Sequence, residues 1–265
     1  MSFRTIEFSP PGAAGEGITH CTVKSAALRR RADITFYVPP GVESGELPLV
    51  ILLHGVYGSH WAWLHKAGAN KVLDRLMREE KLPPMMLAMP SDGLWGDGSG
   101  YLRHRDADYA AWIVEEVPEA AVQADLRCDS NPKFICGLSM GGYGALRLGA
   151  LNPRKFAGIS AHSSITDVTQ MQDFVEESAA EFDLVETEPL SVFECMKLNA
   201  SRLPPFRFDC GVADPLLEHN RKLHHDLQAE GIPHIYEEFP LDHCWPYWSE
   251  HLADSLRFFG SCLAV

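Results

Sequence analysis

Short apolar runs alternate with segments of helical periodicity along most of this 265-residue chain. The runs have the length of strands and end at turn-forming residues; they cover residues 34–38, 49–53, 85–89, 134–138, 156–161, 206–210 and 235–239. Helical segments lie between them, at residues 68–80, 108–126, 139–151, 215–230 and 246–259. This alternation predicts an α/β fold, a mostly parallel central sheet with helices on both faces. Residues 18–38 contain no helix, which predicts an antiparallel N-terminal edge.

Charge and cysteine content limit the partners and the compartment. With 23 basic and 36 acidic residues, the formal charge is −13, which argues against nucleic acid and against an anionic membrane surface. No apolar run approaches the ~20 residues of a membrane span. Seven cysteines without C-x-x-C spacing are typical of reduced thiols, and residues 1–17 lack the apolar core of a secretory signal. We expect a cytoplasmic protein and leave open whether it is a homo-oligomer.

The segment GLSMG places Ser139 between Gly137 and Gly141, directly after an apolar strand and before a helix. A sharp strand-to-helix turn of this kind lifts a serine hydroxyl out of the end of a sheet, and the flanking glycines allow the backbone to fold that tightly. An unactivated serine is a weak nucleophile, so it requires a base in contact and a third group that orients the base. Ser139 is therefore the candidate nucleophile.

The acid and the base are expected on loops after later strands. Asp214 follows the strand at 206–210, and His243 follows the strand at 235–239. Serine, aspartate and histidine thus occur in the order typical of this architecture. Asp167 stays open as an alternative acid. Asp242 is a poor partner for His243, because neighbouring side chains in an extended loop point apart.

Attack of a serine on an acyl carbon also requires N–H donors for the developing oxyanion. One is normally the residue after the nucleophile, here Met140, and the second comes from the loop after an early strand. The segment LLHGVYGSH occupies that place, so Val56 is the first choice and Gly55 the next. The spacings of the histidines match no zinc-hydrolase motif. We therefore expect no metal and no cofactor.

Residues 164–205 interrupt the alternation between two strands. The stretch carries nine acidic residues against Lys197 and Arg202, and its length predicts a surface excursion at one end of the sheet. Two interpretations stay open, a solvated acidic face and a cap over the site. We expect one domain over residues 1–265 with a cap-like insertion at about 164–205.

With these residues placed, the sequence resembles the putative-esterase family of α/β-hydrolases, which includes tributyrin-type, feruloyl and acetyl esterases and S-formylglutathione hydrolase. The likeness extends from about residue 34 to 259 and rests on YVPPG (37–41), LLHG (52–55), GLSMGGYGAL (137–146), CGVADPLLEHNRKLH (210–224) and HCWPYW (243–248). The resemblance implies an α/β-hydrolase fold and a triad at the matching positions Ser139, Asp214 and His243.

The expected activity is that of a serine carboxylesterase acting on a small-molecule ester with a short-chain or small aromatic acyl group. Alternatives are a thioesterase of the S-formylglutathione hydrolase type, a feruloyl or acetyl esterase on carbohydrate, and an inactive binding protein on the same fold. His162 follows a strand and is a candidate pocket residue. Trp63 and Trp245 are candidates for substrate contact, although both also read as core aromatics.

Overall fold

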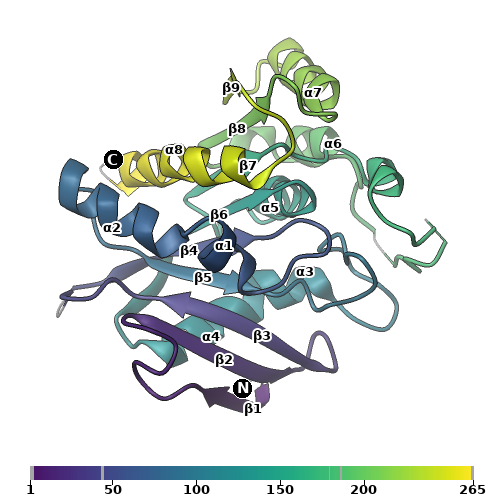
Figure 1. The fold of residues 1–265 in the computed structure, drawn as a ribbon. Helices are drawn as coiled ribbons and strands as arrows, with labels where there is room; N and C mark the ends of the chain where they lie inside the picture. The colour runs from purple at the N-terminus through teal and green to yellow at the C-terminus, as the bar shows by residue number, and fades with distance from the viewer. Residues whose placement is uncertain (1–2, 43–44, 179, 186, 264–265) are drawn as a thin grey trace.

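The computed structural model describes residues 3–42, 45–178, 180–185 and 187–263. Within them the chain forms a nine-stranded sheet in the order β1-β2-β3-β5-β4-β6-β7-β8-β9 (Figure 1). The strands are β1 (Phe3–Phe8), β2 (Ile18–Ser25), β3 (Arg31–Tyr37), β4 (Leu47–Leu53), β5 (Met86–Pro90), β6 (Cys128–Leu138), β7 (Gly158–His162), β8 (Phe206–Gly211) and β9 (Ile235–Phe239). Pairing is antiparallel from β1 to β5 and parallel from β5 to β9. The predicted sheet and its antiparallel edge are confirmed.

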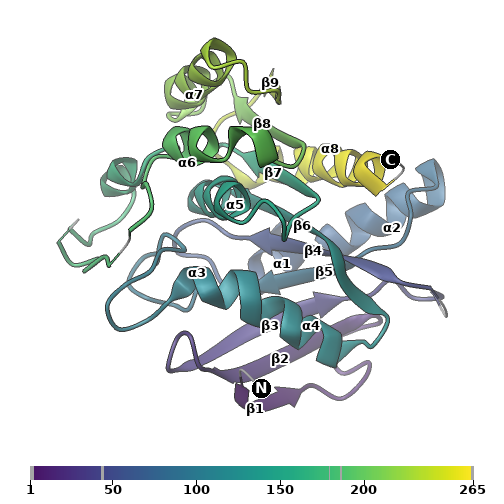
Figure 2. The same cartoon turned by 180° about the vertical axis from the view of Figure 1, so that it is seen from behind.

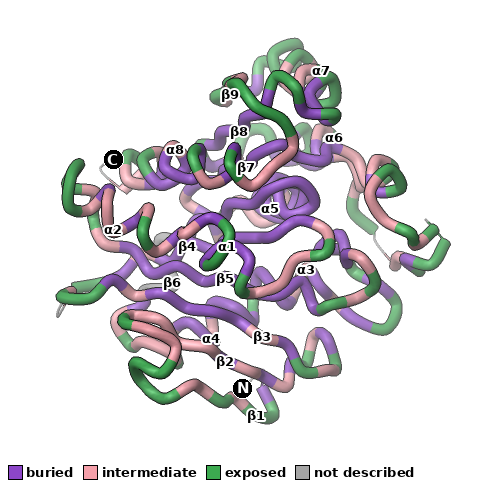
Figure 3. Tube along the Cα trace, viewed as in Figure 1, coloured by how far each residue is buried: buried purple, intermediate pink, exposed green. Residues whose placement is uncertain are grey.

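Helices cover both faces of the sheet. One face carries α1 (Ala62–Lys66), α2 (Ala69–Glu80) and α8 (Trp245–Leu263) (Figure 1). The other carries α3 (Tyr109–Ala111), α4 (Val117–Ala124), α5 (Met140–Leu151), α6 (Val192–Leu198) and α7 (Leu217–Ala229) (Figure 2). Side chains of a strand alternate between faces, so β4 sends Leu49 and Ile51 into one apolar cluster and Val50 and Leu52 into the other. The central strands are consequently buried on both sides (Figure 3).

The helix expected at residues 108–126 is divided into three pieces. After α3 the chain forms a π-helical segment, Trp112–Glu116, and α4 then continues to Ala124. Pro118 lies in the first turn of α4 and has no N–H to donate to a preceding carbonyl. The helix widens just before this residue, and the N–H of Val117 donates to the carbonyl of Trp112, a spacing of five residues.

The excursion between β7 and β8 contains two 3₁₀ helices, Val168–Asp173 and Ala200–Arg202, in addition to α6. It begins at the carboxyl end of β7, where the loops that follow β4, β6, β8 and β9 also leave the parallel part of the sheet. Side chains from these loops can therefore converge at one edge. Across the described residues, no helix has the length and apolar content required to cross a membrane.

Candidate active site

Ser139 occupies a strained turn between β6 and α5. Its φ is 54° and its ψ is −121°, a conformation that residues with a side chain seldom adopt. A Cβ on Gly137 would lie 2.1 Å from the carbonyl oxygen of Gly141, and a Cβ on Gly141 would lie 2.3 Å from that of Leu53. Glycine is required at both positions because this turn packs backbone against backbone. Strain of this kind concentrates at functional sites.

Three loops bring Ser139, His243 and Asp214 together at the carboxyl edge of the sheet. Nε2 of His243 lies 3.0 Å from Oγ of Ser139, and Nδ1 of His243 lies 2.8 Å from Oδ2 of Asp214. A histidine that donates from Nδ1 to a carboxylate leaves Nε2 free to accept the serine proton. The geometry is therefore that of a nucleophile, a base and the group that orients the base.

Burial and hydrogen bonding hold Asp214 in place. Its side chain is fully buried, whereas that of His243 is 19% exposed and can meet a ligand from solvent. The second carboxylate oxygen of Asp214 accepts the N–H of Leu216 at 2.8 Å. Asp167, the alternative acid, instead accepts the N–H of Thr169 at 3.0 Å and begins a 3₁₀ helix of the excursion. The hydrogen bonds thus select Asp214 as the partner of His243.

The loop after β4 lies directly against the serine. A Cβ on Gly55 would lie 3.2 Å from the Cβ of Ser139. A Cβ on Gly98, in the loop after β5, would lie 2.4 Å from Sδ of Met140 and 3.3 Å from Cγ1 of Val56. Met140 opens α5, so its N–H has no acceptor within the helix. The structure thus gathers Gly55, Val56 and Met140 around the nucleophile, and their role as oxyanion donors stays a prediction.

Phe174, from the excursion, covers one side of the candidate base. Its ring stacks on His243 with centroids 5.6 Å apart and planes at 27°. The hydroxyl of Tyr57, one residue after Val56, donates to the carbonyl of Phe174 at 2.7 Å. The excursion therefore lies on the loop after β4 and on the triad at once. Neither residue was singled out from the sequence; the apolar content of 164–205 was the available signal, and the contact itself depends on folding.

Trp248 packs edge-on against His243, with centroids 4.9 Å apart. Trp245 is partly exposed and packs edge-on against Trp248 and against Trp63, which is fully buried. His162 is fully buried as well. Of the three residues expected to contact substrate, Trp245 is the one that reaches solvent. A substrate contact for any of them stays a prediction.

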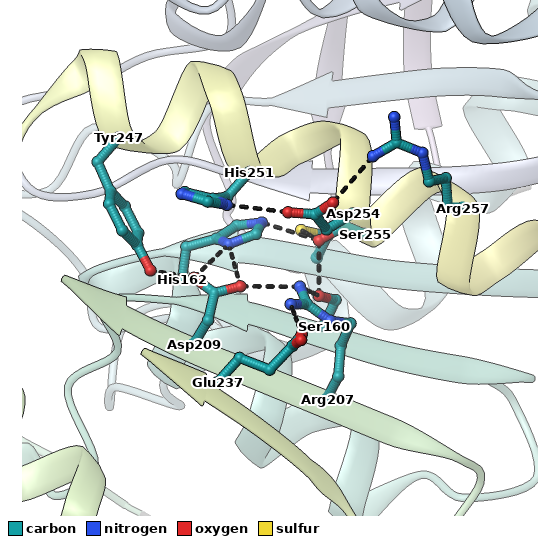
Figure 4. A network of polar contacts seen from close by, with 11 residues as sticks. Ser160, His162, Arg207, Asp209, Glu237, Tyr247, His251, Asp254, Ser255 and Arg257 are labelled. Carbon is teal, nitrogen blue, oxygen red and sulfur yellow. Dashed lines mark hydrogen bonds and ion pairs between the residues drawn. The ribbon is translucent and has the colours of Figure 1, made fainter. Parts of the chain in front are cut away.

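A second group of hydrogen-bonded serine, histidine and aspartate side chains lies in the protein interior, separate from Ser139, His243 and Asp214. Nδ1 of His162 is 2.9 Å from both carboxylate oxygens of Asp209, and Nε2 of His162 is 2.8 Å from Oγ of Ser255 (Figure 4). None of these three residues is exposed to solvent. A substrate cannot reach these buried side chains in this conformation, so we assign the set a structural role. Ser139 therefore remains the candidate nucleophile.

Within the described residues, the remaining histidines are not gathered into a metal centre. His54 is buried and accepts the N–H of Asp92 at 3.0 Å, while Nδ1 of His60 pairs with the hydroxyl of Thr35 at 2.8 Å. In the described part of the chain, no group of three or more His, Cys, Asp or Glu side chains is placed to hold a metal ion.

The family model described as "Putative esterase" matches residues 25–196, which is well over half of the chain. An acetyl esterase from Caldicellulosiruptor saccharolyticus is 27% identical over 82% of this chain and 85% of its own length. The S-formylglutathione hydrolase of Mus musculus is 26% identical over 53% of this chain, and the chain spans about half of that relative, 54% of its length.

Among solved structures, a substrate-bound fluorophosphonate-binding serine hydrolase F from Staphylococcus aureus superposes with a TM-score of 0.77. The match covers 95% of this chain and 99% of that one at 19% identity, so it supports the α/β-hydrolase fold. The family match supplies the reaction class, and the hydrogen-bonded Ser139, His243 and Asp214 supply a matching site. The chain belongs to the Putative esterase family and is a carboxylic ester hydrolase.

Proposed function

We propose that the protein hydrolyses small, uncharged carboxylic esters through an acyl-enzyme on Ser139. The observation that carries the proposal is the unbroken hydrogen-bond chain from Asp214 through His243 to Ser139. Such a chain activates a serine that would otherwise be a poor nucleophile. The acetyl esterase relative, which matches over most of both chains, supports a small acyl group.

In the proposed mechanism, Oγ of Ser139 forms a bond to the acyl carbon while its proton passes to Nε2 of His243. The N–H groups of Met140 and Val56, with Gly55 as the alternative, hold the negative oxygen of the tetrahedral intermediate. His243 then returns the proton to the leaving alcohol as the ester C–O bond breaks. A water molecule repeats these steps on the acyl-enzyme and releases the acid, and Asp214 stabilises the imidazolium throughout.

Negative charge near His243 favours an uncharged substrate. Asp242 precedes the base in the chain, and Asp173 precedes the Phe174 ring that stacks on it. Asp97 lies against the segment that follows Phe174. Its carboxylate accepts the N–H of Glu176 at 2.8 Å, and its own N–H donates to the carboxylate of Glu177 at 3.0 Å. An anionic thioester would approach against this field. We therefore prefer an ester over the glutathione thioester of the second relative.

A substrate panel tests this proposal. We expect kcat/KM for 4-nitrophenyl acetate and butyrate to exceed that for S-formylglutathione by at least tenfold, about 1.4 kcal/mol of differential transition-state binding. The difference should narrow at high salt, which screens exposed charges. Faster turnover of S-formylglutathione would favour the thioesterase, faster turnover of methyl ferulate would favour the feruloyl esterase, and absence of turnover together with absence of fluorophosphonate labelling would favour an inactive binding protein.

We further propose that residues 164–205 act as a cap that selects the acyl group. In Phe174→Ala, relative rates across 4-nitrophenyl esters from acetate to decanoate should change by about tenfold, because the ring beside His243 is lost. Phe193→Ala is the matched control: Phe193 lies on α6 in the same excursion, beside Lys197, and its removal should leave the chain-length profile unchanged. Equal chain-length profiles for Phe174→Ala and the parent protein would contradict the cap and favour a solvated acidic face at residues 164–205.

Compartment and domain organisation are also proposals. Cys21 and Cys210 are free thiols, and burial raises their pKa values, to about 12 in Cys21, so these thiols are unreactive. Free thiols are typical of a reducing compartment, which supports the cytoplasm.

The excursion packs onto α5 and α7 through α6, which supports one domain over residues 1–265 with 164–205 as an insertion.

A further inference from the structure

Asp209, within β8, is the centre of a buried polar network (Figure 4). Its side chain is fully buried and meets three partners: Nδ1 of His162 at 2.9 Å, the hydroxyl of Tyr247 at 2.7 Å and the guanidinium of Arg207 at 2.8 Å. The other Arg207 nitrogen pairs with Glu237 at 2.8 Å. Three charged groups from β7 and β8 and one tyrosine from α8 therefore meet in the protein interior, and Glu237 of β9 pairs with Arg207 from the surface.

The pKa values of this network favour the charged forms. Burial lowers the pKa of His162, but Asp209, together with Cys136, outweighs it and raises the pKa to about 9. Burial likewise opposes ionisation of Asp209, yet His162 and Arg207 hold its pKa below the usual value. The contacts are thus charge-assisted hydrogen bonds, which are shorter and stronger than neutral ones. Separating a buried pair leaves an uncompensated charge, so the network resists displacement of any element attached to it.

Each triad residue is attached to this network through a short backbone path. The N–H of Ser139 donates to the carbonyl of His162 at 3.0 Å. Asp214 lies five residues after Asp209, in the loop that follows the same strand, and Tyr247 lies four residues after His243. The nucleophile, the acid and the base therefore share one buried anchor, although they come from three different loops.

The loops that carry Asp214 and His243 also contact each other directly. The N–H of Ala213 donates to the carbonyl of Leu241 at 3.1 Å. A Cβ on Gly211 would lie 2.5 Å from the same carbonyl oxygen, so only glycine permits this approach. Beyond this contact the chain turns at His243 and enters α8, where Tyr247 is the point at which the helix meets Asp209. The hydrogen bond from the Tyr247 hydroxyl to Asp209 therefore links the segment that follows His243 to the buried network.

We propose that Tyr247, together with the Asp209–His162 pair, is a positioning device that sets the distance between His243 and Ser139. These residues are buried and act through the loops that they hold. Proton transfer from serine to histidine depends on a hydrogen bond of about 2.6–3.2 Å between the reacting atoms, and a displacement of about 1 Å can lower the rate by about 10²-fold. The inference rests on the proposed function of the triad.

The test compares two tyrosine-to-phenylalanine substitutions. In Tyr247→Phe we expect kcat for 4-nitrophenyl acetate to fall about tenfold, KM to change less than twofold, and the rate of fluorophosphonate labelling at Ser139 to fall in parallel with kcat. Tyr37→Phe is the matched control, because Tyr37 is also buried and its hydroxyl also donates to a carboxylate, Asp74, at 2.6 Å. Tyr37 lies on β3, beside the amino half of β5, and its variant should keep the parent kcat and labelling rate.

The outcomes separate the two proposals. A kcat for Tyr247→Phe within twofold of the parent, or an equal loss in Tyr37→Phe, overturns the positioning role while leaving the triad in place. A parent protein that is neither labelled at Ser139 nor active on esters overturns the proposed function itself. If Tyr247→Phe does not fold, Ser255→Ala replaces it, since this variant frees Nε2 of His162 by removing one oxygen atom. A threefold or larger loss of kcat in Ser255→Ala supports the inference, and an unchanged kcat overturns it.

Discussion

Alanine at position 139 is expected to lower kcat for ester hydrolysis by about 10⁵-fold or more and to abolish fluorophosphonate labelling. The expected loss of kcat is this large because no acyl-enzyme can form without the serine. Removal of a triad nucleophile lowers kcat about as much as removal of all three triad residues. The fold should survive, because the strained φ of Ser139 costs alanine and serine alike. Measurement requires single-turnover kinetics and mass spectrometry of the labelled peptide.

Ser163→Ala serves as the control for this loss. Ser163 is a buried serine at the end of the neighbouring strand and also has a positive φ, 48°. Its hydroxyl has no hydrogen-bond partner within the described residues, so its removal should leave the activity close to that of the parent. Full activity in Ser139→Ala, or labelling at a different serine in the parent, would contradict the assignment of the nucleophile.

Replacement of Asp214 by asparagine is expected to lower kcat by about 10³- to 10⁴-fold with little change in KM. The amide retains the shape of the side chain, but it favours the wrong histidine tautomer and cannot stabilise the imidazolium. The buried position of Asp214 prevents water from taking over either role. The loss should appear in pre-steady-state acylation as well as in turnover.

Asp167→Asn separates the two acids that the sequence left open. Asp167 caps a 3₁₀ helix through the N–H of Thr169, and asparagine caps helices nearly as well as aspartate. Its kcat should therefore stay within a few-fold of the parent. A large loss in Asp167→Asn combined with a small one in Asp214→Asn would transfer the acid role to the excursion.

Sequence periodicity was sufficient to predict the mostly parallel sheet and the edge at which Ser139, Asp214 and His243 lie together. Strands and helices of this chain are marked by local patterns, and parallel strands place all their carboxyl ends at one edge. The loops after β6, β8 and β9 therefore emerge at that edge, and Ser139, Asp214 and His243 meet there. The G-x-S-x-G spacing is a local signal, but only Gly137 is required by the turn itself; Gly141 is required by the backbone of Leu53 and His54 at the end of β4.

Several features of the structure are not indicated by the local apolar patterns of the sequence. The strand Phe3–Phe8 and the π-helical segment before Pro118 were not expected. The first depends on pairing with β2, and the second on one missing N–H within an otherwise regular helical pattern. His162 was expected near the pocket because it follows a strand; the structure pairs it with Asp209 in a fully buried position, and its local sequence does not indicate that contact.

The surroundings of the triad were decided by tertiary structure. Phe174 meets His243, and Tyr247 meets Asp209, across 69 and 38 residues of sequence that carry no sign of either contact. Sequence order determined which residues could perform the chemistry, because chain direction and strand polarity determine the edge at which each loop emerges. Packing decided what covers and supports those residues, because side chains from separate loops come into contact only after the sheet has assembled.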